Sequence, residues 1–492
     1  MRFGFGMQVA VVSDRMTAYA FIAHRIRQLL PGLLLFAMLA GCSSLPVLHP
    51  DMSLRRGEPV QLEGARGPLS AQRSKEILDG LKGKNKDAGI FDRHLAIEEA
   101  TVGTPLVVGN RAVLLQDGKA TYDAMLAAIA GAKDHINMET YIIEDDEVGK
   151  RFADALIEKQ RTGVQVNFIY DSVGSNKTPK EFFKRMSDSG IAVLEYNPIN
   201  PLSAKAGWDV NQRDHRKLLI ADGQIAFLGG VNISSVYSGR RSGGSSPDQR
   251  AAPKRAKQPE GPQPPWRDTH LSLEGPVVAH FQKLFMATWE SQKGKPLAQR
   301  RYLPDLTAKG KEVVRAIGSS PNDGYNLIYA TLISAIRNAE STVYITNAYF
   351  VPDSQFLAAL KGAAQRGVDV KLILPSKTDS WLVLNAGRSY YSDLLEAGVK
   401  IYERRNQLLH SKTVVIDGVW STVGSTNLDW RSFLHNQEVN AVILGPDFGA
   451  QMRRIFDADL AQSDAITRQQ WELRPPSSRL REGAARIWEY WL

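Results

Sequence analysis

Apolar and polar positions alternate in two segments of the chain that resemble one another. Residues 211–232 read NQRDHRKLLIADGQIAFLGGVN, and residues 408–427 read LLHSKTVVIDGVWSTVGSTN. Alternation places successive side chains on opposite faces of a strand, and an Asp-Gly dipeptide favours a tight turn. Each segment therefore predicts a β-hairpin, with a strand, a turn and a returning strand.

Helical and strand-like periods also follow one another in the same order twice. In the first half, helices are predicted at 118–133, 148–160 and 277–292, and strands begin at His135 and Val164. In the second half, helices are predicted at 329–337, 354–365 and 448–461, and strands at 343–351 and 368–374. This order is typical of α/β layers, and its repetition indicates a duplicated half-domain. The sequence predicts an α/β fold of two similar halves, each a mixed β-sheet flanked by helices.

The composition of the chain changes outside these two halves, and the changes predict further segments. The predicted organisation is a signal segment at 1–41, a tether at 42–103 with a helix around 74–81, a first half at 104–300, a second half at 301–465 and a tail at 466–492. Within the first half, residues 239–265 are rich in Gly, Ser, Pro, Lys and Arg, a composition that cannot bury a core. They predict a flexible basic insertion, which is either a solvated loop or a site for anionic headgroups.

The N-terminal segment has the pattern of a bacterial lipoprotein signal. Arg25 and Arg27 precede an apolar run that is short for a bilayer span and ends in Leu-Ala-Gly before Cys42. This pattern predicts cleavage before Cys42 and lipid on its thiol, with Met16 as a candidate start. The protein would then be anchored at the cell envelope and face the periplasm. An uncleaved anchor and a plain buried cysteine are the alternatives.

Charge limits the class of partner. Of the formal net charge of +9, residues 1–41 supply +3 and residues 239–265 supply +4, which leaves +2 for the rest of the chain. A nucleic-acid-binding protein needs a broad basic face on its folded part, so the balance argues against that class. The C-terminal ARIWEYWL is aromatic and follows several arginines. It predicts either a membrane-interfacial tail or a segment that packs against the domain.

The chemistry-bearing residues occur at the same spacing in both hairpins. The first contains His215, Lys217, Asp222 and a Gly-Gly-x-Asn ending at Asn232. The second contains their counterparts, namely His410, Lys412, Asp417, Ser425 and Asn427. One carboxylate follows each motif at a comparable position, as Asp268 and Glu438. Each hairpin therefore presents an imidazole and an ammonium group from a rigid sheet.

These paired His-x-Lys-x-x-x-x-Asp motifs, with Gly-Gly-x-Asn and Gly-Ser-x-Asn tails, are similar to those of the phospholipase D superfamily. The resemblance covers roughly residues 104–465. Within it, the stretches INMETYIIEDDEVG, ITNAYFVPD and STNLDWRSFLHNQEVN resemble the bacterial cardiolipin synthases. The lipoprotein-type signal and the insertion at 239–265 depart from that group, many of whose members carry membrane spans.

The resemblance implies that the two phospholipase D-like halves pack around one shared active site. It implies a phosphohistidine intermediate, with His215 as nucleophile and His410 as general acid and base. The sequence by itself leaves the two histidine roles interchangeable. The remaining residues are expected in supporting roles: Lys217, Lys412, Asn232, Asn427 and Ser425 around the phosphate, Asp268 and Glu438 on the imidazoles, and Asp222 and Asp417 ordering the site from the turns. Glu139 is a weaker candidate, because a buried strand end would explain it equally well.

The predicted activity is transfer of a phosphatidyl group from phosphatidylglycerol to a second phospholipid, which gives cardiolipin without a metal or cofactor. Phospholipids and a membrane surface are the expected partners. A phospholipase D that transfers the group to water is the first alternative, because the sequence does not show how well the pocket excludes water. A nuclease and a catalytically silent lipid-binding lipoprotein are weaker alternatives.

Overall fold

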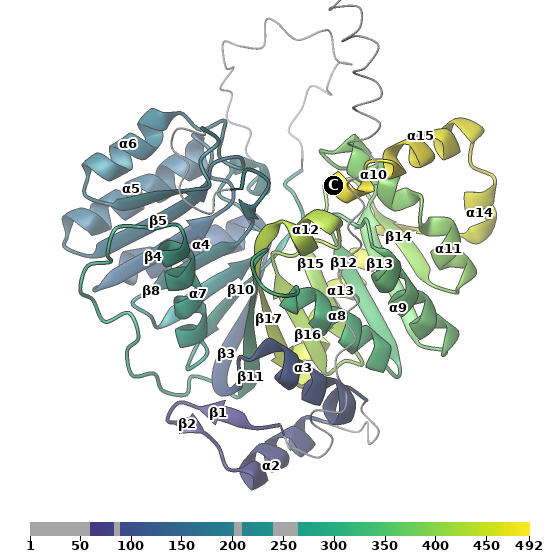
Figure 1. Ribbon diagram of the computed structural model, residues 1–492, viewed down its shortest axis with the longest axis horizontal. Helices are drawn as coiled ribbons and strands as arrows, with labels where there is room; N and C mark the ends of the chain where they lie inside the picture. Colours follow the sequence, from purple (N-terminus) through teal and green to yellow (C-terminus); the bar gives the residue numbers. More distant parts are fainter. Residues whose placement is uncertain (1–59, 83–88, 201–208, 240–263) are drawn as a thin grey trace, which may run out of the picture. The chain divides into compact units, whose positions relative to one another are not determined.

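The computed structural model describes residues 60–82, 89–200, 209–239 and 264–492. The predicted signal segment, Cys42 and residues 240–263 of the predicted insertion lie outside this part of the chain. The described residues form two α/β halves (Figure 1), as predicted.

Each half contains a mixed sheet with the same order of strands. The order in the first half is β6 (Ala192–Tyr196), β5 (Gln165–Asp171), β4 (His135–Thr140), β8 (Lys217–Ala221), β9 (Ile225–Gly229), β10 (Thr269–Glu274) and β3 (Leu106–Gln116). The order in the second half is β14 (Lys400–Arg404), β13 (Asp369–Pro375), β12 (Thr342–Asn347), β15 (Lys412–Ile416), β16 (Trp420–Gly424), β17 (Asn436–Leu444) and β11 (Glu312–Ser319). The first three strands of each series run parallel and the other pairs antiparallel, which confirms the duplication.

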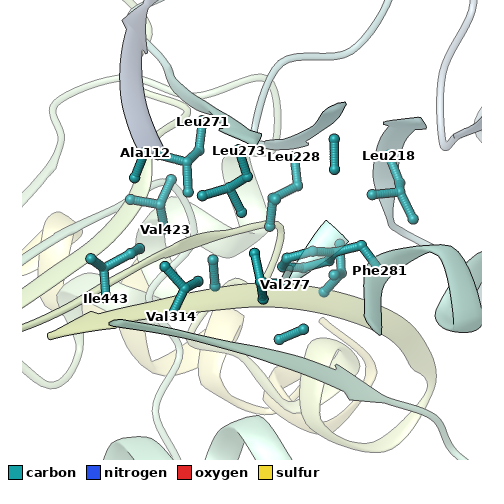
Figure 2. Packing of buried hydrophobic residues seen from close by; sticks show 14 of the residues in the cluster. Ala112, Leu218, Leu228, Leu271, Leu273, Val277, Phe281, Val314, Val423 and Ile443 are labelled. Atoms are coloured by element: carbon teal, nitrogen blue, oxygen red, sulfur yellow. The ribbon is translucent and has the colours of Figure 1, made fainter. Parts of the chain in front are cut away.

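Two strands that the sequence pattern did not predict join the halves. β3 and β11 pair antiparallel, with Asn110 opposite Glu312 and Val107 opposite Val314 on either side of a register shift. The core also crosses the join. Figure 2 shows Leu218, Leu228 and Phe281 of the first half together with Val423 and Ile443 of the second. The halves therefore share one apolar interior and hold each other in a fixed relation.

Helices cover the outer face of each sheet and fill the space between the sheets. In the first half, α4 (Asp117–Gly131), α5 (Glu147–Arg161) and α6 (Lys180–Asp188) bury their apolar faces against β4, β5 and β8. In the second half, the corresponding region contains α8 (Leu327–Asn338), α9 (Ser354–Gln365), α10 (Trp381–Arg388) and α11 (Tyr391–Glu396). α7 (Val278–Ser291) and α13 (Pro446–Ala461) contribute to the shared core.

The two hairpins turn at Asp222 and Asp417, as predicted. Both residues have positive φ, at 53° and 52° respectively, a conformation that aspartate tolerates in turns. The Asp222 carboxylate accepts hydrogen bonds from the backbone N–H groups of residues 133–135, and the Asp417 carboxylate accepts from those of residues 340–342. Each aspartate therefore ties its turn to the start of the neighbouring strand, β4 or β12.

The segment predicted as a tether contains ordered structure over its described residues. β1 (Leu62–Gly64) pairs with β2 (Gly67–Pro68) and parallel to β3, and α2 (Ala71–Leu81) follows it. A π-helical turn (Ile90–His94) and α3 (Leu95–Val102) then pack on α8 and bury Ile90 and Leu95 completely. The helix expected around residues 74–81 is therefore present as α2, within a longer ordered segment. The apolar side chains of this segment are too widely spaced to show a period, and they become buried only against the second half.

The tail folds back on the second half through α14 (Arg468–Glu472), α15 (Pro476–Arg486) and a 3-10 turn at Glu489–Trp491. The Tyr390 hydroxyl donates to Glu489, and the rings of Trp430 and Tyr490 lie 5.8 Å apart. Packing against the domain, one of the two alternatives that the sequence left open, therefore occurs at these residues. Among the described residues, no helix combines the length and the apolar character that a membrane crossing requires.

Candidate active site

The histidines of the two motifs line one cavity of about 440 Å³, together with Asn232 and Asn427. His215 lies just before β8 and His410 just before β15, so both imidazoles stand at the same end of their hairpins. Only 7% of His215 and 6% of His410 is exposed, because the opposite half covers each of them. Two residues that are far apart in sequence thus face the same small volume.

Each imidazole is held by a carboxylate from the other half of the molecule. Nδ1 of His215 lies 3.0 Å from Oε1 of Glu438, and Nδ1 of His410 lies 2.8 Å from Oδ2 of Asp268. Backbone hydrogen bonds connect the two halves at the same places. The N–H of His215 donates to the carbonyl of Gln437, and the N–H of His410 donates to the carbonyl of Arg267. A carboxylate at Nδ1 favours the tautomer in which that nitrogen carries the proton, so Nε2 is left free to react.

The two carboxylates are supported differently. Glu438 accepts from Oγ of Ser425 and from Nδ2 of Asn436, and burial raises the pKa of Glu438 to about 7. Asp268 accepts a hydrogen bond from the N–H of Thr269. Its carboxylate also occupies the space beside Gly230, because a Cβ atom at position 230 would lie only 2.2 Å from Oδ1 of Asp268. Position 230 must therefore be glycine, to leave room for the Asp268 carboxylate. Its counterpart in the second half, Ser425, instead donates a hydrogen bond to Glu438, whose side chain is one methylene longer than that of aspartate.

Both motif lysines are almost fully buried, and neither is among the residues that line the cavity. Nζ of Lys217 donates to the carbonyl of His215 at 2.6 Å, and Nζ of Lys412 donates to the carbonyl of His410. Burial lowers the pKa of Lys217 to about 7 and that of Lys412 to about 8. An anion in the cavity would restore the charged form of both lysines, so the pair is suited to a phosphate.

The motif asparagines differ in their hydrogen bonding. Asn232 accepts from Ile142 N through Oδ1 and donates to the Tyr237 hydroxyl at 3.0 Å through Nδ2. Asn427 is 4% exposed, and its buried Oδ1 has no hydrogen-bond partner among the described residues. Asn427 therefore keeps hydrogen-bonding capacity at the cavity wall.

The surroundings of the two histidines set them apart electrostatically. Burial, followed by the charges of Lys217 and Lys412, lowers the pKa of His215 well below its usual value. Burial and Lys412 also lower the pKa of His410, but the Asp268 carboxylate opposes that shift. Burial thus favours the neutral form of both rings, and at His410 the Asp268 carboxylate opposes that shift.

Four other predicted residues lie away from the cavity. Ser425 was predicted to contact the phosphate. Its side chain is instead fully buried, and its hydroxyl donates a hydrogen bond to Glu438. Asp222 and Asp417 lie at the far ends of their hairpins, where they order the turns. Glu139 is buried in β4, 3.9 Å from Arg216, and is part of the interior behind His215.

Sequence reasoning missed the aromatic lining of the cavity. The Tyr141 ring lies edge-on to His215 with centroids 4.9 Å apart, and Lys217 lies 5.0 Å from the centre of the same ring. Tyr237 and Trp266 flank His410, with ring centroids 5.7 and 5.5 Å away. No spacing marks these residues, because Tyr141 and Trp266 reach the cavity from separate loops, and Tyr237 lies beside His410 in a 3-10 turn at Ser235–Tyr237. Within the described residues, no cluster of three or more His, Cys, Asp or Glu side chains is arranged to hold a metal ion.

The chain is similar to known proteins over most of its length. A family model described as cardiolipin synthase, PLD-like domain, matches residues 125–238 and 332–460, which include both motifs. The cardiolipin synthase of Geobacillus kaustophilus is 33% identical over 386 residues, which cover 78% of this chain and 72% of that protein. Cardiolipin synthase 2 of Bacillus anthracis is 35% identical over 376 residues, which cover 76% and 69% respectively. Among solved structures, phosphatidylserine synthase from Haemophilus influenzae shares the fold, with a TM-score of 0.54 at 13% identity over 77% of this chain and 95% of that one.

Proposed function

Because the chain belongs to the cardiolipin synthase family of phospholipase D-like enzymes, we propose that it makes cardiolipin by transferring a phosphatidyl group. The donor is phosphatidylglycerol, and the acceptor is the hydroxyl group of a second phospholipid. The observation that carries the proposal is the crosswise pair of oriented imidazoles on one cavity. One imidazole bonds to phosphorus while the other moves the protons.

In the first step, Nε2 of His215 attacks phosphorus and the bond from phosphorus to the glycerol oxygen breaks. Protonated His410 gives its proton to that oxygen, so glycerol leaves as a neutral alcohol. His215 is suited to attack because burial and the nearby lysines disfavour its protonated form. His410 is assigned as the donor because the Asp268 carboxylate at its Nδ1 favours the protonated ring and opposes the lowering of its pKa by burial and Lys412. The product of this step is a phosphatidyl group on His215.

In the second step, neutral His410 removes the proton from the acceptor hydroxyl. The acceptor oxygen forms a bond to phosphorus, the bond from phosphorus to nitrogen breaks, and His215 returns to its starting state. Lys217, Lys412 and the Nδ2 amide of Asn427 stabilise the negative charge that grows on the non-bridging oxygens during both steps. Splitting the exchange into two displacements removes the need for both lipids to react at once.

Product analysis of the full-length protein tests this proposal. With phosphatidylglycerol vesicles as the sole lipid, cardiolipin and glycerol should form in equal amounts. Phosphatidic acid in place of cardiolipin would overturn the transferase and leave a phospholipase D. His215→Ala and His410→Ala should each abolish turnover, whereas His280→Ala, on α7 outside the cavity, should retain it.

The N-terminal pattern supports anchoring of this enzyme at a membrane surface in the cell envelope through lipid on Cys42. Growth with labelled palmitate should label the wild type and leave Cys42→Ala unlabelled. Equal labelling of both proteins would contradict the lipoprotein prediction.

A further inference from the structure

The C-terminal arm, defined here as residues 468–492, exposes a row of large apolar side chains. Leu480 is 74% exposed and Ile487 71% exposed. These two residues and Ala484 follow the spacing of one helix face, at i, i+4 and i+7. Trp488 and Trp491 continue the exposed surface, at 42% and 57%. Soluble surfaces rarely gather so many large apolar groups without a partner.

The opposite face of the arm is fixed to the domain. Ser478, Glu482 and Ala485 share the other side of α15, where Glu482 and Ala485 are buried. Glu482 forms a buried ion pair with Arg474 at 2.9 Å. α15 also lies along α10, so the exposed row has a defined direction and is not the frayed end of a chain.

The exposed row continues into the mouth of the active-site cavity. Trp491 and Leu492 line the cavity together with His215 and His410. Trp381, at the start of α10, is 52% exposed, and its neighbours Ser380 and Val383 line the same cavity. In Figure 1, α10, α12 and α15 lie near the marked C-terminal end of the chain. The apolar row and the reaction centre thus open on the same side of the second half.

Cations accompany the apolar row. Arg479 and Arg481 are exposed on α15, beside Leu480. Among the described residues, Arg479 donates to the carbonyl of Glu472 and Arg481 to the hydroxyl of Ser478, so neither is neutralised by a carboxylate there. Tryptophan and leucine beside arginine are suited to the boundary between headgroups and acyl chains, where arginine meets anionic phosphates.

We propose that the C-terminal arm, with Trp381, is a docking surface for the interfacial layer of an anionic phospholipid bilayer. Docking would insert the row of Leu480, Ile487 and Trp488 among the lipids and turn the mouth of the cavity toward the headgroups. The choice of a bilayer as occupant rests on the proposed function, because the surface is continuous with a cavity whose substrate would be a phospholipid. Charge complementarity with phosphatidylglycerol supports the same occupant.

Fluorescent labels on the full-length protein test the docking surface directly. The chain has a single cysteine, so Cys42→Ser provides a background without thiols. An environment-sensitive label is placed at Leu480→Cys or at Ile487→Cys, and a control label at Leu303→Cys. Leu303 is 46% exposed and lies between Tyr302 and Pro304, which meet the Gly223 turn at the end of the hairpin away from His215.

Vesicles of phosphatidylcholine with one part in three of phosphatidylglycerol should shift the emission of the labels at 480 and 487 to shorter wavelength. Lipids with a nitroxide in the acyl chain should quench these two labels and leave the label at 303 unquenched. Phosphatidylcholine alone should give a weaker response. If all three labels respond equally, the docking surface does not exist. A response at 480 that grows with protein concentration without vesicles would replace the bilayer with a second copy of the chain.

An activity measurement separates this proposal from the proposed function. Leu480→Ser with Ile487→Ser should lower the rate on vesicles by about tenfold or more, because each exposed apolar side chain contributes about a factor of ten in partitioning. The same variant should act normally on phosphatidylglycerol dispersed in detergent micelles. Full cardiolipin synthesis without label insertion would overturn the docking surface alone. Label insertion with phosphatidic acid as product would overturn the proposed function alone.

Discussion

Oδ2 of Asp268 accepts a hydrogen bond of 2.8 Å from Nδ1 of His410, although the two residues belong to different halves of the molecule. Glu438 holds His215 in the reciprocal arrangement. Neither motif is therefore complete within its own half. The catalytic geometry depends on the packing of β3 against β11 and on the core that the halves share.

Asp268→Asn should lower kcat by roughly a hundredfold or more with little change in KM. The amide removes the charge that favours protonated His410, so the proton donor of the first step is weakened. Steady-state kinetics on phosphatidylglycerol would measure the effect, with the exposed Asp305→Asn as a matched control. Near-normal kcat in Asp268→Asn would show that His410 does not need its carboxylate.

Activity should fall as the pH drops below about 7, because Glu438 then takes up a proton and no longer supports His215 as an anion. Ser425→Ala removes a hydrogen bond that favours the charged form of Glu438, so the pKa of Glu438 should rise further. In a plot of kcat against pH, the acidic limb should therefore move to higher pH in Ser425→Ala. In Ser425→Thr, which keeps a hydroxyl, the acidic limb should lie where it does in the wild type. A change in rate without this movement would indicate a role for Ser425 other than supporting Glu438.

Lys217→Met should stabilise the empty enzyme while abolishing turnover. Burial holds the pKa of Lys217 at about 7, below its unfolded value, so the unfolded state binds the proton more tightly. The cost of the buried charge is fully present below pH 7 and fades as the pH rises toward 10. Chemical denaturation at pH 6 should show a gain of about 2 kcal/mol, which shrinks at pH 9. A loss of stability at pH 6 would contradict this account.

Asp222→Ala and Asp417→Ala should each destabilise the fold by about 3 kcal/mol, because each leaves several backbone N–H groups without their acceptor. The remaining folded protein should keep most of its kcat, since neither carboxylate reaches the cavity. Thermal unfolding together with kinetics at low temperature separates the two effects. A large loss of kcat in a fully folded variant would assign these residues to the chemistry.

Chelators should leave the rate of cardiolipin formation unchanged. The two histidines carry the nucleophile and the protons, and the two lysines carry the positive charge that phosphoryl enzymes otherwise obtain from metal ions. Dialysis against EDTA followed by product analysis would measure this. A strong loss that Mg²⁺ or Ca²⁺ restores would point to a metal site that the proposed steps lack.

The sequence predicted those features that depend on local spacing. Alternation and the Asp-Gly dipeptides defined both hairpins, and repetition defined the two halves. The position of one acid after each motif singled out Asp268 and Glu438. It did not reveal that each acid serves the histidine of the other half, because that pairing is made by backbone contacts between the halves, where residues 436–437 pair with 213–214 and Arg267 pairs with Leu409.

Other features depend on the assembled fold and had no pattern to reveal them. Tyr237 reaches His410 from a 3-10 turn and Trp266 from a loop, and Ser425 meets Glu438 across paired strands. Ile90 and Leu95 showed no period in the sequence, and they become buried where the π-helical turn and α3 pack on α8 of the second half. A periodic pattern shows which face of a helix or strand is buried. It does not show contacts with partners that are remote in sequence, and these residues make such contacts.

The reciprocal carboxylates also govern when the enzyme becomes active during its synthesis. His215 leaves the ribosome with its whole motif, but its orienting partner is 223 residues further along the chain. A nascent or truncated polypeptide that ends before Glu438 has a nucleophile with no fixed tautomer. Attack on lipid must therefore wait until translation has delivered the second half, which brings Glu438 and His410 together with His215.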